Sequence, residues 1–163
     1  MNKVKIEFNV NKALYGLLDD NDFNAIIKKA ISGYSAEAGE VLGQIVAKNH
    51  FGEEFFKCGR NAAGYDIYNE DESILVEVKT ASSLNGSSNQ FLISSFKNKR
   101  NKATHFLIID AYSTEIRLFM VPHDDFFDRL TFSRSDKDAI TWNATYESGR
   151  NMNHEILLEF EII

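Results

Sequence analysis

The sequence predicts a mixed α/β fold, and three features of its 163 residues indicate it. Alternating apolar residues open the chain, as in a half-buried strand. Two stretches with helical spacing follow, and several short apolar runs separated by polar turns come after them. With 44% hydrophobic and 12% aromatic residues, the chain is large enough to bury a core, so we expect one domain spanning residues 1–163.

The first expected elements are one strand and two helices. Residues 4–10 alternate as a strand, and residues 12–31 carry apolar side chains at helical spacing. Ser35 fits the N-cap of the second helix, and Gly52 can end it. The apolar stripe of this second helix consists of Ala38, Val41, Leu42 and Ile45.

Four extended segments are expected after this helix. Residues 64–68 and 74–80 form two runs joined by the polar turn of residues 69–73. Residues 105–110 are a continuous apolar run, which is typical of a central strand. Residues 116–121 are expected to pair with that central strand.

The last third of the chain is expected to hold a short helix, polar loops and a final strand. Pro122 stands where a helix of residues 123–130 would begin. Residues 82–90 and 131–151 are polar and resemble long loops, while residues 156–162 alternate as in a strand.

Composition excludes several classes of protein. The single cysteine, Cys58, excludes an internal disulfide, and four scattered histidines show no zinc-ligand spacing, so we expect a reducing, cytoplasmic setting. No apolar run approaches the roughly 18 residues of a membrane span, and we expect no targeting signal, because the first ten residues alternate. The net charge of -6 argues against coating nucleic acid by bulk charge, although a local basic strip is compatible with it.

An acid and a base interrupt the apolar run of residues 73–81. If the preceding turn is centred between residues 71 and 72, Asp66 directly opposes Glu77, and opposed like charges are destabilising. Period-two alternation places Lys79 on the same face as Glu77. Two carboxylates and a main-chain carbonyl form an oxygen site suited to Mg²⁺. A bulge in the turn would shift this register by one and direct Asp66 to the opposite face.

The segments GYDIY (residues 64–68) and VEVK (residues 76–79) resemble the PD-(D/E)XK nuclease superfamily, which includes many type II restriction endonucleases. The preceding stretch AGEVLGQIVAKNHFG strengthens the resemblance, which covers Ser35 to Ser82. Tyr65 replaces the usual proline before the first acid. The resemblance implies a restriction-endonuclease-like α/β fold with a central mixed β-sheet flanked by helices.

The resemblance also implies a catalytic arrangement. Asp66, Glu77 and the carbonyl of Val78 would bind Mg²⁺, for which Mn²⁺ is a possible substitute, and the ion would activate water and polarise the phosphate. Lys79 would position or help deprotonate the attacking water. The expected products carry a 5′-phosphate and a 3′-hydroxyl.

An acid on the helix before these strands joins the active site in that superfamily. The resemblance favours Glu40 for this role, where it would bind the water or a second ion. The helical wheel instead places Glu37 nearer the apolar stripe, so Glu37 is the second choice. Either acid also suits the first turns of a helix simply through the helix dipole.

Two groups of residues are candidates for DNA contacts. Cations of the first group would grip backbone phosphates, and the second group has residue types used for groove or base contacts. For both groups an ordinary solvated surface is the alternative. The first group is Lys97, Lys99, Arg100 and Lys102, and the second is Arg134, Asn143 and Arg150.

The predicted metal site and the resemblance together imply a magnesium-dependent endodeoxyribonuclease that acts on double-stranded DNA as a sequence-specific type II restriction endonuclease. One alternative is a structure-specific repair or recombination nuclease, and another is a non-cleaving DNA-binding subunit of the same fold. A homodimer is expected, because cutting both strands of a symmetric site suits two active sites related by a two-fold axis.

Overall fold

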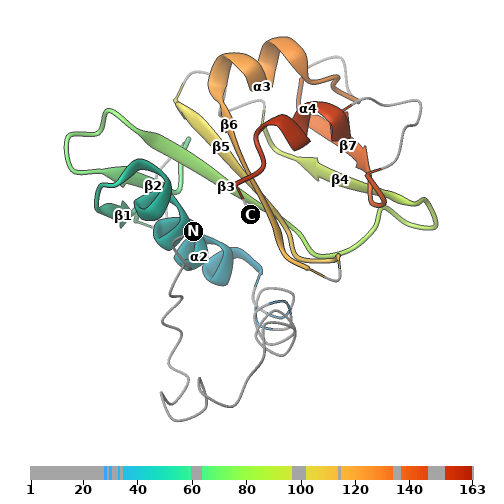
Figure 1. The fold of residues 1–163 in the computed structure, drawn as a ribbon, viewed down its shortest axis with the longest axis horizontal. Coiled ribbons are helices and arrows are strands. Elements are labelled where there is room, and N and C mark those ends of the chain that lie inside the picture. Colours follow the sequence, from blue (N-terminus) through green and yellow to red (C-terminus); the bar gives the residue numbers. More distant parts are fainter. Residues whose placement is uncertain are drawn as a thin grey trace.

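The computed structural model describes residues 28, 30, 33, 35–59, 64–96, 102–113, 115–133, 137–146 and 153–162, with only the backbone of residues 35–37 (Figure 1). The predicted strand of residues 4–10 and nearly all of the predicted helix of residues 12–31 lie outside these residues. Within the described part of the chain, the fold is mixed α/β. None of its helices has the length and apolar composition needed to cross a membrane.

A mixed five-stranded sheet forms the centre of the fold, with the strand order β1-β2-β3-β5-β6. Among the described strands of this sheet, only β3 and β5 pair in parallel, and the other neighbours are antiparallel. Strands β4 and β7 form a separate antiparallel pair. The strands are β1 (Phe55–Lys57), β2 (Ile67–Asn69), β3 (Leu75–Ala81), β4 (Gln90–Ser94), β5 (His105–Asp110), β6 (Arg117–Pro122) and β7 (Ala139–Asn143).

The helix α2 (Ser35–Phe51) packs unusually closely on one face of the central sheet. A Cβ atom added at Gly39 would lie 2.6 Å from Thr80 Oγ1, and one at Gly43 would lie 2.8 Å from Val78 Cγ2. The helix therefore depends on two glycines, one turn apart, to approach β3. The buried stripe is rotated from the predicted one, because these glycines contribute to it together with Leu42, Val46 and Ala47.

The opposite face of the sheet carries the second and larger part of the core. Apolar residues of β5 and β6 pack there against β4, β7 and two short helices, α3 (His123–Arg129) and α4 (Asn153–Glu159) (Figure 1). Trp142, Phe91 and Phe96 are completely buried in this layer. The central sheet therefore separates α2 from the β4–β7 layer.

Several predicted elements are confirmed. Gly52 ends α2 with a φ of 79°, and its N–H donates to the carbonyl of Lys48. The predicted turn of residues 69–73 joins β2 and β3, and the central strand pairs with its predicted neighbour as β5 with β6. Helix α3 begins directly after Pro122, as predicted.

Two predictions for the last third of the chain are wrong. Part of the expected final strand is helix α4, in which Asn153, His154 and Leu157 are buried at helical spacing. Only the end of the chain is extended, where the Ile162 N–H donates to the carbonyl of Leu118 on β6. The expected loop of residues 131–151 contains β7, whose apolar side chains complete the core against β4.

Candidate active site

The β2–β3 hairpin confirms most of the predicted register. Ile67 pairs with Val76, and Tyr68 pairs with Leu75. The Asp66 N–H, however, donates to the carbonyl of Val76 at 2.9 Å. Asp66 and Ile67 therefore both oppose Val76, which is the arrangement of a β-bulge, and the predicted direct opposition of Asp66 and Glu77 is wrong.

The bulge brings the Asp66 carboxylate against the backbone of β3. Its Oδ2 atom accepts the Val78 N–H at 2.8 Å. A side-chain oxygen thus takes the place that a main-chain carbonyl would occupy in a continuous ladder. The carboxylate lies beside Val78, between the positions of Glu77 and Lys79 along the strand.

Glu77 and Lys79 form an ion pair on the face of β3 that points away from α2. The Glu77 Oε1 atom lies 2.9 Å from Lys79 Nζ, and the two side chains are 1% and 22% exposed. Lys79 Nζ also lies 5.9 Å from the centre of the Phe96 ring. The predicted placement of Lys79 beside Glu77 is confirmed, and the acid is buried while the base reaches solvent.

Glu40 lies on α2 and pairs with Lys57 of β1, with 3.0 Å between Glu40 Oε2 and Lys57 Nζ. Both side chains are about one third exposed, at 29% and 34%. Glu40 therefore lies at the margin of the sheet on the α2 side, and its catalytic role stays a prediction. The side chain of Glu37, the second choice, lies outside the described residues.

The Cys58 thiol lies close enough to the predicted acids for their charges to affect its pKa. Burial raises its pKa to about 11, with further contributions from the negative charges of Asp66, Glu40, Glu72 and Glu77. The Cys58 N–H also donates to the carbonyl of Asp66 at 2.8 Å. The charges of the three predicted acids, Asp66, Glu77 and Glu40, therefore all raise the pKa of this one thiol. Sequence reasoning used Cys58 only as evidence against a disulfide.

The donor set fits Mg²⁺, which takes one or two carboxylates and keeps several waters. The fitting groups are the carboxylate of Asp66, which accepts the Val78 N–H, the carboxylate of Glu77, which pairs with Lys79, and the carbonyl of Val78. Among the residues that the structure describes, no group of three or more His, Cys, Asp or Glu side chains is arranged to hold a metal ion.

The predicted DNA-contact residues divide into two sets. Lys102 is exposed, and its side chain packs so closely on Gly64 that a Cβ atom there would overlap it. Asn143 is in β7, where its side-chain oxygen accepts the Thr145 N–H at 3.1 Å and thereby stabilises the following turn. The remaining candidates lie outside the described residues, namely Lys97, Lys99, Arg100, Arg134 and Arg150.

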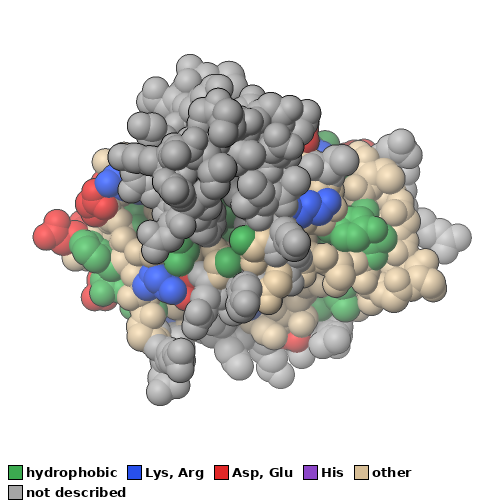
Figure 2. Space-filling view, turned by 90° about the horizontal axis from the view of Figure 1, so that it is seen from below, with side chains coloured by type: hydrophobic (Ala, Val, Ile, Leu, Met, Phe, Trp, Pro, Cys, Tyr) green, Lys and Arg blue, Asp and Glu red, His purple; other side chains and the backbone are tan. Residues whose placement is uncertain are grey.

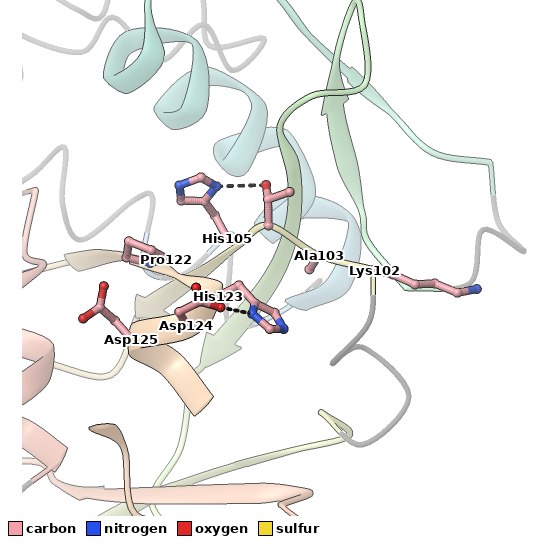
Figure 3. Close-up of a pocket in the computed structure, with 8 residues that line it drawn as sticks. Lys102, Ala103, His105, Pro122, His123, Asp124 and Asp125 are labelled. Carbon is pink, nitrogen blue, oxygen red and sulfur yellow. Dashed lines mark hydrogen bonds and ion pairs between the residues drawn. The ribbon is translucent and has the colours of Figure 1, made fainter. Parts of the chain in front are cut away.

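A pocket of about 670 Å³ lies where β5 begins and β6 ends, and Lys102 is one of its lining residues (Figure 3). His105 Nδ1 lies 2.9 Å from Thr104 Oγ1, and His123 Nδ1 lies 2.8 Å from Asp124 Oδ1. Burial lowers the pKa of His105, which is therefore neutral at pH 7. Figure 3 shows the Lys102 side chain pointing away from both imidazole rings.

The chain matches no protein-family model and no curated protein. Function is therefore inferred from the arrangement of Asp66, Glu77 and Lys79. These residues combine two acids and a base around one strand, with the base partly open to solvent.

Proposed function

We propose that the chain is a magnesium-dependent endodeoxyribonuclease of the PD-(D/E)XK superfamily. The observation that carries the proposal is the placement of three ionisable groups at neighbouring positions along β3. The Asp66 carboxylate lies at the Val78 N–H, and Glu77 and Lys79 pair on either side of that residue. A central mixed sheet with helix α2 before the two acid-bearing segments agrees with the restriction-endonuclease-like fold that the sequence resembles.

Asp66, Glu77 and the Val78 carbonyl are the groups that would hold Mg²⁺. When bound, this ion polarises the scissile phosphate and lowers the pKa of a coordinated water. The protein contributes the positions of the donors. The bulge at Asp66 and the hydrogen bond from Val78 orient one carboxylate, and burial restricts the other.

Lys79 has two roles in this proposal. In the structure its ammonium group compensates the buried charge of Glu77. Because its side chain is 22% exposed, it also reaches the surface that a phosphate of DNA would approach. There it would orient the attacking water and offset phosphate charge.

The test is cleavage of mixed plasmid and phage DNA in Mg²⁺, with EDTA and the variant Lys79→Ala alongside. Lys48→Ala is the matched control, because Lys48 pairs with Glu54 on the exposed surface. Discrete fragments that disappear in EDTA and in Lys79→Ala, but persist in Lys48→Ala, are the expected result. Absence of cleavage by folded protein across Mg²⁺ and Mn²⁺ would contradict the proposal and favour a non-cleaving DNA-binding subunit.

Sequence-specific cleavage of double-stranded DNA and homodimer formation are the finer parts of the proposal. Discrete fragments define a recognition sequence, whereas a smear favours a nuclease that recognises DNA structure. A dimer allows both strands of a symmetric site to be cut in one encounter. A monomeric mass by gel filtration, both with and without DNA, would contradict dimerisation.

A further inference from the structure

Three aromatic side chains form a continuous row beside the candidate active site. Phe56 of β1 directly opposes Tyr68 of β2, and their ring centres are 5.8 Å apart. The Tyr68 ring lies 6.2 Å from that of Tyr65. Phe56 is 44% exposed, and both tyrosines are partly exposed. We call Phe56, Tyr68 and Tyr65 the aromatic row.

The aromatic row shares a sheet face with the predicted catalytic pair. Ile67 faces α2, because a Cβ atom at Gly43 would lie 3.6 Å from Ile67 Cδ1. Alternation therefore directs Tyr68 and its partner Phe56 away from α2, as it does Glu77 and Lys79. Tyr65 is next to Asp66 in sequence, so the row runs from the sheet edge to the first predicted acid.

The two ends of the aromatic row lie near side chains of opposite charge. Beyond β1 and β2, acidic side chains gather at the end of the molecule that holds the β2–β3 turn (Figure 2). At the other end, Lys102 packs on Gly64, which is adjacent to Tyr65. A polyanion on this face would direct its phosphates toward Lys102 and Lys79 and away from the turn. The exposed acids near the turn are Glu53, Glu54, Glu70, Asp71 and Glu72.

From these positions we infer that the aromatic row stacks unpaired bases of the DNA strand being cut, an inference that rests on the proposed nuclease function. Base–aromatic stacking tolerates any sequence and is a common basis of single-strand binding. Within a duplex, neighbouring base pairs cover the faces of each base, so stacking on Phe56 or Tyr68 requires an unpaired base. Among double-stranded DNA substrates, the preferred ones are therefore duplexes with unpaired nucleotides beside the cleaved bond.

Fluorescence of 2-aminopurine tests this inference without requiring cleavage. The base is placed at an unpaired position of a gapped duplex, or at the same position of the fully paired duplex, and titrated with wild-type protein in EDTA. Stacking on an aromatic ring is expected to quench the gapped substrate only. Phe56→Ala is expected to weaken binding of the gapped substrate by about 5- to 150-fold, the range of stacking contributions per base.

Three further variants separate stacking from simple apolar contact. Phe56→Trp keeps an aromatic face and should retain the quenching, whereas Phe56→Leu keeps apolar area without a ring and should lose it. Tyr112→Ala is the matched control, because Tyr112 is 42% exposed and follows the far end of β5. It should bind the gapped substrate as wild type does.

The outcomes distinguish failure of the inference from failure of the proposed function. Magnesium-dependent cleavage that is lost in Lys79→Ala but occurs equally on paired and gapped DNA, with Phe56→Ala unaffected, overturns stacking and keeps the nuclease. Quenching that Phe56→Ala abolishes, without cleavage in any metal, supports stacking and rejects the nuclease. A dimer that Phe56→Ala dissociates, without quenching, shows that the row covers a second copy and overturns the inference.

Discussion

Replacing Lys79 by alanine removes the cation that compensates the Glu77 carboxylate. This carboxylate is 1% exposed and its ion-pair distance to Lys79 is 2.9 Å. Removing one partner of a buried pair typically costs about 3–5 kcal/mol, because the remaining charge stays buried. Since Lys79 is 22% exposed and water reaches its end of the pair, we expect the lower limit, about 3 kcal/mol.

Urea unfolding of four proteins measures this effect: wild type, Lys79→Ala, Glu77→Gln and the double variant. The double variant should lose about 2 kcal/mol less than the sum of the single variants, because removing both charges leaves none buried without compensation. By heat, Lys79→Ala should unfold about 6–12 °C below wild type, at roughly 2–4 °C per kcal/mol for a chain of this size.

Lys48→Ala provides the control, because the side chains of its ion pair with Glu54 are 55% and 66% exposed. An exposed pair is expected to contribute less than about 1 kcal/mol. If Lys79→Ala were as stable as Lys48→Ala, the pair of Glu77 and Lys79 would not be a buried one, and the reasoning would be refuted. The cleavage assay of Lys79→Ala must also be run well below its unfolding temperature.

Two other perturbations test the surroundings of the site. Gly43→Ala should lower the free energy of unfolding by about 1–3 kcal/mol in urea, because its Cβ atom would lie 2.8 Å from Val78 Cγ2. Gly59→Ala, with no atom within 4 Å of its Cβ, should change it by less than about 0.5 kcal/mol, and equal effects would contradict the close packing. At pH 8 the Cys58 thiol should react with an aromatic disulfide about 10- to 100-fold more slowly than an ordinary thiol, because a pKa of about 11, against 9.0, leaves little thiolate, partly offset by the higher nucleophilicity of a more basic thiolate. The rate should rise with pH up to about 11, and Asp66→Asn should increase it at pH 8 by removing a negative charge; an ordinary rate in the wild type would contradict the raised pKa.

The sequence alone determined the features that depend on neighbouring residues. Alternation and turn residues predicted the hairpin, and its register at Ile67 and Val76 is confirmed. Period-two geometry was sufficient to place Lys79 beside Glu77. Strand β5 and the short helix after Pro122 could also be predicted, because a continuous apolar run indicates a buried strand and a proline often marks the start of a helix.

The tertiary structure decided whatever depends on contacts between distant segments. Alternation assumes a regular ladder, so it could not predict the bulge that places the Asp66 carboxylate at the Val78 N–H. A helical wheel counts apolar side chains, so it gave no weight to Gly39 and Gly43, although close approach to β3 requires them. Which cation Glu40 pairs with follows from the same docking of the helix.

The last helix also shows the difference between local sequence pattern and long-range packing. The alternation of residues 156–162 suits a strand, yet burial of Leu157 in the core selects a helix, because packing outweighs a weak local preference. The aromatic row was likewise invisible in the sequence, since Phe56 and Tyr68 become neighbours only when β1 pairs with β2. Local pattern thus determined which residues are candidates for the chemistry, and long-range packing decided which of them meet.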